Sequence, residues 1–541
     1  MLSDGIKIIE PGEGPPADGA LMAVGGKAFN LLKLAAMGFP VPPGFVLPTS
    51  MCAGWIADGP PDADAFRALI GAPLDRLERA AGAGFGDAKR PLLVSVRSGA
   101  PASMPGMLDT VLDIGLTRAT TPGLVAQTGN PRMAWDCYLR LIESYAATVH
   151  GLTAAAFADA NAKAMAQTGA ASPAELDTLA LRDLVEHYLD AFERATGDAF
   201  PDDPFEQLLN AVSAVFRSWD SQRAKSYRRI NKLDGLPGTA VTVQRMVYGN
   251  AGPKSGAGVG FTRDPATGDK QLYLDFAFDA QGEDVVSGRR RLTPAGELAR
   301  VLPEVKHALE RIAAKLEQVF RDAQDFEFTV EEGALFLLQT REAKRSAWAR
   351  LKIAVDLVHE GLIDPAEALR RLDGLDLSTL TRRRVVDGLG EAIAQGVPAG
   401  IGVASGTIAL TIEAARARAA EGQSVILVRN DIATDDIDGI ASAEGVLTAR
   451  GGRTSHAAVV ARELGKVAIV GCHALRIAPN EKSCTIAGHA FEDGARITLD
   501  GETGRIYAGG VEVTEEQPLK ELAQIEAWRA VLGGGTKTAT A

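Results

Sequence analysis

The segment GVLTARGGRTSHAAVVARELG, residues 445–465, constrains the fold of this chain more than any other. An apolar, strand-like run leads into a Gly-Gly turn, and apolar residues at helical spacing follow the turn. Thr454 or Ser455 is a natural N-cap for that helix, because a hydroxyl oxygen accepts a hydrogen bond from a free backbone N–H group of the first turn. We therefore expect a strand–turn–helix unit of an α/β domain.

His456 falls in or beside the first turn of the predicted helix. Helix N-termini favour anions, and the same field disfavours an imidazolium ion, so we expect a neutral imidazole near pH 7. A neutral imidazole is a nucleophile, and the helix end would hold a phosphoryl group that it gained. A histidine that only caps or packs beside a helix is the plainer alternative. The Gly-Gly approach and the neighbouring hydroxyl pair favour the phosphoryl acceptor.

The surrounding residues 396–515 have the same α/β character. VILVRN, GVLTA, VAIVG and ARITLDG are strand-like runs separated by turns, and IEAARARAAEG has helical spacing. This region is therefore predicted to be a compact unit with its own core. The whole chain has 541 residues, which is too many for one hydrophobic core, so about two to four packed units are expected.

The rest of the chain mixes strand-like and helical patterns. Strand-like runs occur at residues 92–96 and 241–247. The predicted regions are residues 1–345 with a mainly helical part at about 132–230, a helical linker at 346–395, and a C-terminal helix with a flexible tail at 516–541. The linker ends in the Arg-rich run TRRRVVDG, which is more typical of a solvated face than of a binding site.

Composition excludes several classes of protein. The net charge is −12 and no long basic run occurs, so nucleic acid is not an expected partner. No apolar window of about 18 residues is present, and the N-terminus lacks the pattern of a signal peptide, so no membrane partner is expected. The four cysteines are widely spaced without a CxxC pair, which is typical of reduced thiols. These features predict a location in the cytoplasm.

Three segments could bind phosphate groups. Lys27 follows a Gly pair at a helix start, but without P-loop spacing a solvated lysine is the better interpretation of this segment alone. Arg97 ends an apolar strand, and its guanidinium suits phosphate oxygens or a structural ion pair equally. A glycine-rich stretch with Gly256, Gly258 and Gly260 is predicted to be a loop between two strands. Its backbone could cover a phosphate chain, although a plain hairpin loop fits as well.

A β-hairpin is predicted from QDFEFTVEEGALFLLQTREAKR, with its turn at residues 331–333. Because side chains at i and i+2 share a face of a strand, Asp325 and Glu327 point together on one strand. Gln339 and Arg341 point together on the other. Two carboxylates on one face suit Mg²⁺ at a phosphate, although unpaired acids of this kind usually lie on a solvated edge.

Taken together, these segments resemble the pyruvate, phosphate dikinase family over roughly residues 20–510. The most specific stretches are LLVSVRSGAPASMPGMLDT, VFRSWDSQRAKSYRR, AQGEDVVSG, QDFEFTVEEG with LLQTR, and GGRTSHAAVVAR. The resemblance implies an α/β multidomain protein. It has an ATP-grasp nucleotide-binding region with a helical insertion, followed by a swivelling β/α phosphohistidine domain. Hinges are expected near residues 385–398 and 510–520, where Gly and polar residues gather.

The resemblance also implies the roles of individual residues. His456 would carry the phosphoryl group, and Thr454 beside it matches a threonine that a regulatory kinase/phosphatase modifies in some members. ATP would be bound by Lys27, Arg97, Glu283, Gln339 and Arg341, to which the glycine-rich stretch adds Gly256 and Gly258. Asp325 and Glu327 would hold Mg²⁺, and a monovalent cation remains an open expectation.

In this family, the β-phosphoryl group of ATP reaches the histidine by way of a pyrophosphoryl-enzyme. AMP is released, and inorganic phosphate takes the other phosphoryl group to form pyrophosphate. Members go on to a TIM barrel that binds pyruvate or phosphoenolpyruvate. The residues after 515 leave no room for a barrel, which needs about 250 residues. We therefore expect a separate barrel chain, a different acceptor, or a fragment of a longer protein. Family members usually form homodimers or homotetramers.

Two residues depart from the family pattern. Pro101 stands where the family loop usually has arginine, which removes a positive charge near the expected triphosphate. Arg453 stands where the family usually has methionine and is similar to the first enzyme of the sugar phosphotransferase system. Pro101 and the absent barrel support an alternative hypothesis, in which the chain is a non-catalytic ATP-binding sensor or scaffold derived from this family.

Overall fold

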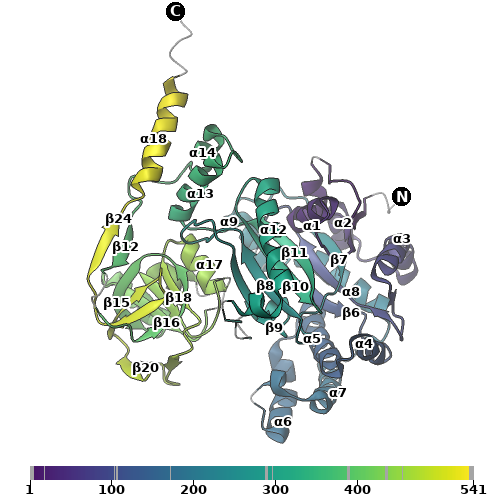
Figure 1. Ribbon diagram of the computed structural model, residues 1–541. Coiled ribbons are helices and arrows are strands. Elements are labelled where there is room, and N and C mark those ends of the chain that lie inside the picture. The colour runs from purple at the N-terminus through teal and green to yellow at the C-terminus, as the bar shows by residue number, and fades with distance from the viewer. Residues whose placement is uncertain are drawn as a thin grey trace, which may run out of the picture. The chain divides into compact units, whose positions relative to one another are not determined.

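The computed structural model describes residues 5–17, 19–102, 104, 108–170, 172–286, 290, 292–294, 296–386, 390–432, 437–453 and 455–534 (Figure 1). The chain divides into two compact units by its internal contacts. The first comprises Met1–Ser255 and Thr329–Thr340, and the second comprises Gly256–Phe328 and Arg341–Ala541. This division follows other boundaries than the domains predicted from the sequence, which stay predictions.

A five-stranded antiparallel sheet is the centre of the first unit, with the order β1-β2-β7-β5-β6. Its strands are β1 (Lys7–Ile9), β2 (Gly44–Leu47), β7 (Ala240–Arg245), β5 (Val94–Gly99) and β6 (Thr110–Ile114). A short parallel pair joins β3 (Gly84–Phe85) and β4 (Pro91–Leu92). The strands predicted at residues 92–96 and 241–247 are thereby confirmed.

The helices of the first unit follow the predicted helical spacing. They are α1 (Ala20–Ala36), α2 (Ser50–Ala57), α3 (Ala63–Ala81), α4 (Thr121–Thr128), α5 (Pro131–His150), α6 (Ala158–Thr168), α7 (Thr178–Thr196), α8 (Pro204–Ser218) and α9 (Gln222–Ile230), with 3₁₀ turns η1 (Ala154–Phe157) and η2 (Pro173–Glu175). Helix α8 packs against β5, β6 and β7, and α5 packs against α7 (Figure 1). The mainly helical part predicted at 132–230 is confirmed.

A second sheet has the order β11-β10-β8-β9. Its strands are β8 (Gly256–Phe261), β9 (Tyr273–Phe278), β10 (Gln324–Glu331) and β11 (Ala334–Glu342). Positive φ angles of 47° at Glu332 and 84° at Gly333 form the turn between β10 and β11, which confirms the predicted hairpin. The accompanying helices of the second unit are α10 (Gly282–Val286), α11 (Glu297–Val301), α12 (Pro303–Phe320), α13 (Ala347–His359) and α14 (Pro365–Arg371).

The C-terminal part of the second unit contains an eight-stranded mixed sheet with the order β13-β23-β22-β15-β16-β17-β18-β14. The strands are β13 (Ala394–Gln395), β14 (Val397–Gly400), β15 (Val403–Ala409), β16 (Val425–Arg429), β17 (Gly445–Thr448), β18 (Val467–Val470), β22 (Arg496–Asp500) and β23 (Arg505–Ala508). Strands β15 to β18 run parallel. Helices α15 (Ile412–Ala420), α16 (Ile437–Ser442) and α17 (His456–Glu463) connect them.

Both faces of this sheet are covered. Along β16, Val425 and Leu427 pack with α15 and α17, whereas Ile426 and Val428 pack on the opposite face. That face is closed by the three-stranded sheet of β19 (Leu475–Ile477), β20 (Ser483–Ile486) and β21 (His489–Glu492). Burial on both faces explains why VILVRN is continuously apolar rather than alternating.

A two-stranded ribbon joins the segments on either side of this sheet domain. Strand β12 (Arg382–Val385) pairs antiparallel with β24 (Val513–Glu516), and Arg382 and Arg383 form ion pairs with Glu516 and Glu515 at 2.8 and 3.3 Å. The Arg-rich run is therefore partly paired. The hinges predicted beside this ribbon stay predictions.

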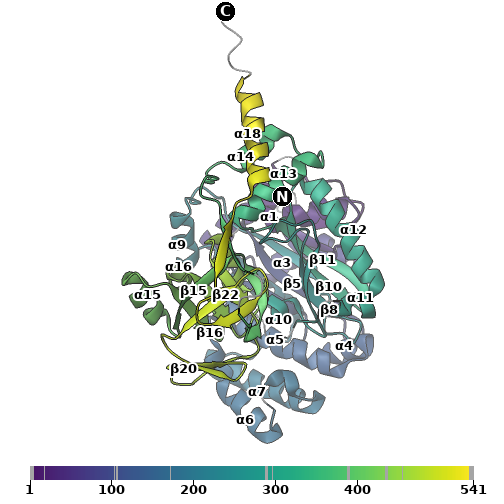
Figure 2. The same cartoon turned by 60° about the vertical axis from the view of Figure 1, so that its left-hand side comes forward.

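Helix α18 (Leu519–Gly534) follows the ribbon and lies beside α13 and α14, as Figure 1 and Figure 2 both show. Ile525 is buried in that contact, whereas Leu519 and Val531 are exposed. This confirms the predicted C-terminal helix. Within the described ranges, no helix is both long and apolar enough to cross a bilayer.

We expect Ile426→Ala to lower the free energy of unfolding of the second unit by about 2–5 kcal/mol, because the fully buried side chain would leave a cavity. Calorimetric unfolding measures the loss. Leu464→Ala, at a side chain that is 43% exposed, is the control and should have little effect. Equal losses for both variants would contradict the buried position of Ile426.

Candidate functional site

Lys27 lies on α1, directly after a kink at Gly25 with a φ of 75° and a ψ of 161°. A Cβ atom at Gly25 would lie 1.9 Å from the carbonyl oxygen of Gly99, so only glycine lets α1 approach the end of β5. The backbone N–H of Gly26 donates to the carbonyl of Ala100 at 2.9 Å. The Gly pair therefore lets α1 approach the backbone at the end of β5, and Lys27 follows this pair directly in the chain.

Arg97 and Gln339 belong to the same part of the first unit. The half-buried Arg97 donates from Nη1 to the carbonyl before Gln339 at 3.3 Å. Asn30, one turn after Lys27 on α1, donates to the carbonyl after Gln339 at 2.7 Å. Gln339 itself is only 7% exposed. Asn30 on α1 and Arg97 on β5 thus hold the backbone of β11 on either side of Gln339.

Asp325, Glu327 and Arg341 belong to the second unit. Asp325 and Glu327 occupy alternate positions of β10, as predicted, and Asp325 is 3% exposed. Arg341 donates from Nε to both carboxylate oxygens of Asp325, at 2.9 and 2.8 Å. Burial raises the pKa of Asp325 to about 6, although Arg341 opposes the rise. The carboxylate is therefore held at a cost that a cation beside it would reduce.

The donor set suits a cation that reaches the protein with phosphate oxygens. Among the described residues, no group of three or more His, Cys, Asp or Glu side chains could hold a metal ion by itself. Two carboxylates are sufficient for Mg²⁺ at a nucleotide, because phosphate oxygens and waters complete its octahedral shell. Asp325 and Glu327 therefore fit the predicted Mg²⁺. Glu283 lies exposed in the first turn of α10, in the same unit.

Gly256, Gly258 and Gly260 have a structural explanation that the sequence did not reveal. They alternate along β8 and are buried, so the predicted loop at these positions is wrong. A Cβ atom at these three positions would lie 2.2, 2.6 and 2.3 Å, respectively, from an aromatic ring carbon. The rings belong to Phe276, Phe328 and Phe326. The glycines make room for side chains of neighbouring strands, and that packing is non-local in sequence.

His456 is the first residue of α17. Ser455 is the N-cap, with an extended backbone, and its hydroxyl oxygen accepts from the N–H of Ala458 at 3.4 Å. Of the two predicted caps, the structure therefore selects Ser455. Thr454 lies outside the described residues. The expected neutral imidazole of His456 stays a prediction.

Arg462, which the sequence reasoning missed, fixes the loop before α17. It is 2% exposed and donates to the carbonyls of Arg453, Ala399 and Lys344 at 2.9, 3.3 and 3.5 Å. Burial lowers its pKa to about 10, so the guanidinium remains charged at neutral pH. A lone cation among the apolar residues of VVARELG was the available signal.

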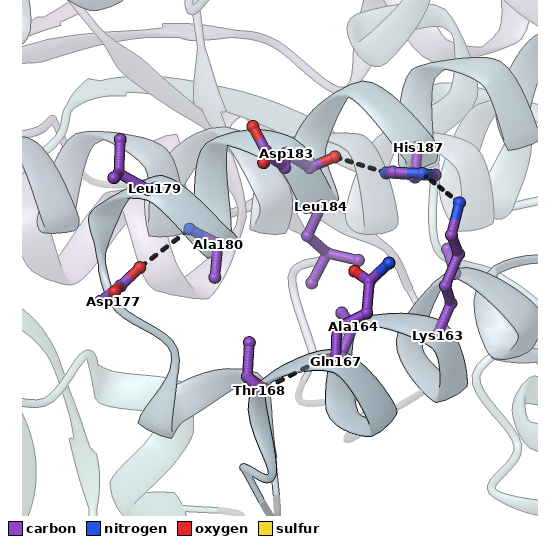
Figure 3. Close-up of a pocket in the computed structure, with 11 residues that line it drawn as sticks. Lys163, Ala164, Gln167, Thr168, Asp177, Leu179, Ala180, Asp183, Leu184 and His187 are labelled. Carbon is purple, nitrogen blue, oxygen red and sulfur yellow. Dashed lines mark hydrogen bonds between the residues drawn. The ribbon is translucent and has the colours of Figure 1, made fainter.

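A pocket of about 250 Å³ lies between α6 and α7 in the first unit (Figure 3). His187 donates from Nδ1 to the carbonyl of Asp183 at 2.7 Å, which leaves Nε2 to accept from the Lys163 ammonium group at 3.0 Å. The pocket is lined by acidic, basic and apolar side chains, but by none of the residues predicted to bind ATP or a metal. The pocket is therefore separate from the candidate sites.

Two family models match the chain. The AMP/ATP-binding domain of pyruvate phosphate dikinase matches residues 66–295, and the mobile domain of PEP-utilising enzymes matches residues 421–504. The first match covers part of each unit, and the second contains β16, β17, α17 and His456. Of the candidate ATP and Mg²⁺ residues, Arg97 and Glu283 lie within the first match. The remaining side chains lie outside both matches: Lys27, Asp325, Glu327, Gln339 and Arg341.

Curated relatives agree with both matches. Pyruvate, phosphate dikinase of Clostridium symbiosum is 42% identical over 509 residues, which is 93% of this chain and 58% of that protein. The chloroplastic pyruvate, phosphate dikinase 1 of Arabidopsis thaliana is 42% identical over 90% of the chain and 51% of that protein. The Rhizobium meliloti enzyme is 39% identical, with shares of 93% and 58%. The chain therefore spans little more than half the length of these relatives.

We expect Gly25→Ala to destabilise the first unit by about 1–3 kcal/mol, because its Cβ would overlap the Gly99 carbonyl and its φ is unfavourable for alanine. The adjacent Gly26→Ala is a matched control, since the nearest atom to its Cβ lies 3.6 Å away. Chemical denaturation of both variants measures the difference. A stability of Gly25→Ala equal to that of Gly26→Ala would contradict the close approach of α1 to β5.

Proposed function

The chain belongs to the pyruvate, phosphate dikinase family, and from this premise we propose that it transfers a phosphoryl group from ATP to His456. The observation that carries the proposal is the Ser455-capped helix that begins at His456, within the match to the mobile domain of PEP-utilising enzymes. The free N–H groups of that helix end would stabilise a phosphoryl group on the imidazole.

The proposed reaction conserves every phosphoryl group of ATP. His456 attacks the β-phosphorus, AMP leaves, and a pyrophosphoryl group remains on the imidazole. Inorganic phosphate then attacks the terminal phosphorus, pyrophosphate leaves, and a single phosphoryl group stays on His456. A neutral imidazole is required at the first step, because only its lone pair can attack phosphorus.

The ATP ligands in this proposal are the residues inferred from the sequence. In the first unit they are Lys27, Arg97 and Gln339, and the hydrogen bonds to the backbone around Gln339 support this grouping. The arginine fork and the lysine ammonium group suit phosphate oxygens. In the second unit, the proposal assigns ATP to Arg341 and Glu283 but not to Gly256 and Gly258, whose backbone lies within the buried strand β8.

Mg²⁺ is assigned to Asp325 and Glu327. It would neutralise the charge of the phosphate oxygens and orient them for in-line attack. The raised pKa of Asp325 supports this assignment, because a buried carboxylate gains most from a divalent cation. A monovalent cation remains part of the proposal without a residue assigned to it.

The second acceptor is proposed to be pyruvate, which would receive the phosphoryl group of His456 to form phosphoenolpyruvate. The names of the relatives support pyruvate and phosphate as substrates. A barrel domain, on a separate subunit, would supply the pyruvate site. We also propose a homodimer, a cytoplasmic location and, at Thr454, a phosphorylation that would block His456 by charge and bulk.

Incubation with ATP labelled at the β or the γ position tests the first half-reaction. With Mg²⁺ and phosphate, we expect the β-label on the protein in an acid-labile, base-stable form, and the γ-label in pyrophosphate. Without phosphate, both labels should remain on the protein. His456→Ala should carry neither label, because the nucleophile is absent.

Absence of protein-bound label in the presence of ATP, Mg²⁺ and phosphate would refute the transfer. Nucleotide binding without AMP formation would then favour a non-catalytic ATP sensor or scaffold. Chromatography of the products separates AMP, ADP and pyrophosphate, and thus also excludes an ordinary kinase that transfers the γ-phosphoryl group.

Asp325→Asn should slow labelling of His456 by about 100-fold or more and raise the Mg²⁺ concentration needed, because a carboxylate ligand is lost. Asp322→Asn is the matched control. Asp322 is also buried and paired with an arginine, Arg345 at 2.7 Å, but it is not a proposed ligand. It should lower stability without shifting the Mg²⁺ dependence. Labelling rates at a series of Mg²⁺ concentrations measure both effects, and an unshifted Asp325→Asn curve would refute the assignment.

A further inference from the structure

Arg453, in the loop between β17 and α17, reaches from this sheet domain to two residues of the β8–β9 segment of the same unit. Its Nη1 lies 3.3 Å from Oδ2 of Asp264, and its guanidinium carbon lies 3.7 Å from the centre of the Tyr273 ring. Its Nε donates to the carbonyl of Pro398 on β14. The side chain is only 15% exposed. The guanidinium therefore bonds the sheet domain through Nε, and it contacts the β8–β9 segment through Nη1 and through its face.

Asp264 and Tyr273, the two partners of Arg453, are each held by hydrogen bonds that do not involve Arg453. Asp264 accepts at Oδ1 from the backbone N–H groups of Ala266 and Thr267, at 2.8 and 3.2 Å, which leaves Oδ2 for Arg453. The hydroxyl of Tyr273, at the start of β9, donates to Asp275 at 2.9 Å. Little side-chain entropy would be lost when the guanidinium docks on such preorganised groups.

The backbone of the loop lies equally close to β9. A Cβ atom at Gly452 would lie 2.8 Å from Oδ2 of Asp275 and 2.9 Å from the side chain of Leu292. Glycine at this position therefore lets the loop lie against β9, and Arg453 follows it directly. Arg462 fixes the loop from behind by donating to the carbonyl of Arg453. The loop thus has a defined shape with one cationic side chain pointing at Asp264 and Tyr273.

We propose that Arg453 is a positioning residue that docks the loop before α17 onto Tyr273 and Asp264, and so presents His456 for phosphorylation. This inference rests on the proposed function. A cation–π stack and a partly exposed ion pair shift a docking equilibrium by roughly tenfold to thirtyfold, which is strong enough to favour docking and weak enough to permit release. Methionine, which cannot form either contact, should dock less.

If Arg453 stabilised only the loop that contains it, its replacement would change the mobility of different segments. The hydrogen bond to Pro398 lies within the sheet domain and would stabilise the loop whether or not it is docked. Loss of that bond would loosen the loop and β14. Loss of docking would also raise the mobility of β9 and of the turn at residues 264–269, because these segments carry Tyr273 and Asp264.

Hydrogen exchange of the full chain without nucleotide separates these cases. Arg453→Met and Tyr273→Leu should each raise exchange about tenfold in residues 449–453, in β9 and in the turn at residues 264–269. Tyr273→Phe keeps the ring and should stay near the wild type in the loop. Because the two side chains form one contact, the double variant Arg453→Met/Tyr273→Leu should exchange little faster than either single variant. Unchanged exchange in β9 and the turn in Arg453→Met would overturn the proposal.

Single-turnover labelling of His456 then measures the consequence for the reaction. Arg453→Met should label about tenfold more slowly than the wild type at saturating ATP, with ATP affinity unchanged. Arg453→Lys, which keeps the charge but not the planar stack, should be intermediate. Arg505→Met, at an exposed position of β23, is the matched control and should label like the wild type.

The two measurements fail independently. A wild type that takes no label would refute the proposed function and leave the docking contact to be judged by hydrogen exchange alone. A wild type that labels, with Arg453→Met labelling at the same rate, would refute the positioning role and leave the proposed function intact.

Discussion

The conformation of the loop before α17 depends on one buried cation, the guanidinium of Arg462. Removing such a group from water costs several kcal/mol, so its acceptors must be held in place. They are three backbone carbonyls from separate segments: Arg453 in the loop, Ala399 on β14 and Lys344 after β11. Satisfying one side chain therefore fixes three pieces of backbone at once. The position of Arg453 and the start of α17 at His456 follow from that arrangement.

In the first unit, backbone segments are positioned closely because a glycine has no side chain at the point where they meet. Gly25 allows α1 to touch the backbone at the end of β5, and hydrogen bonds from Arg97 and Asn30 then bind the backbone on either side of Gln339. These hydrogen bonds restrict the movement of the β11 backbone, and therefore of Gln339 between the two bonded carbonyls. The proposed ATP ligands of this unit are thus positioned by main-chain contacts, which tolerate variation in side chains elsewhere.

Local patterns in the sequence were sufficient for the features that local chemistry determines. The hairpin with its turn at residues 331–333, the helical part near residues 132–230 and a hydroxyl cap before His456 all depend on neighbours in the chain. The glycines of β8 were misread as a loop because their cause is three aromatic rings on other strands. The carbonyl partners of Arg462 were missed for the same reason. Residue types indicate chemistry, but partners distant in sequence decide whether a residue serves packing or binding.

The pair formed by Asp325 and Arg341 joins the electrostatics of the second unit to the proposed chemistry. Asp325 is buried, the side chain of Arg341 is 43% exposed, and each charge partly neutralises the other. If Mg²⁺ took the carboxylate of Asp325, Arg341 would lose its partner and need another anion, which the phosphate groups of the same nucleotide would supply. Metal and phosphate would then bind together at lower cost than either alone, because the buried carboxylate keeps a cation beside it and the guanidinium keeps an anion. In this way a protein with a net charge of −12 can bind a polyanion although few Lys or Arg side chains contact the phosphate groups.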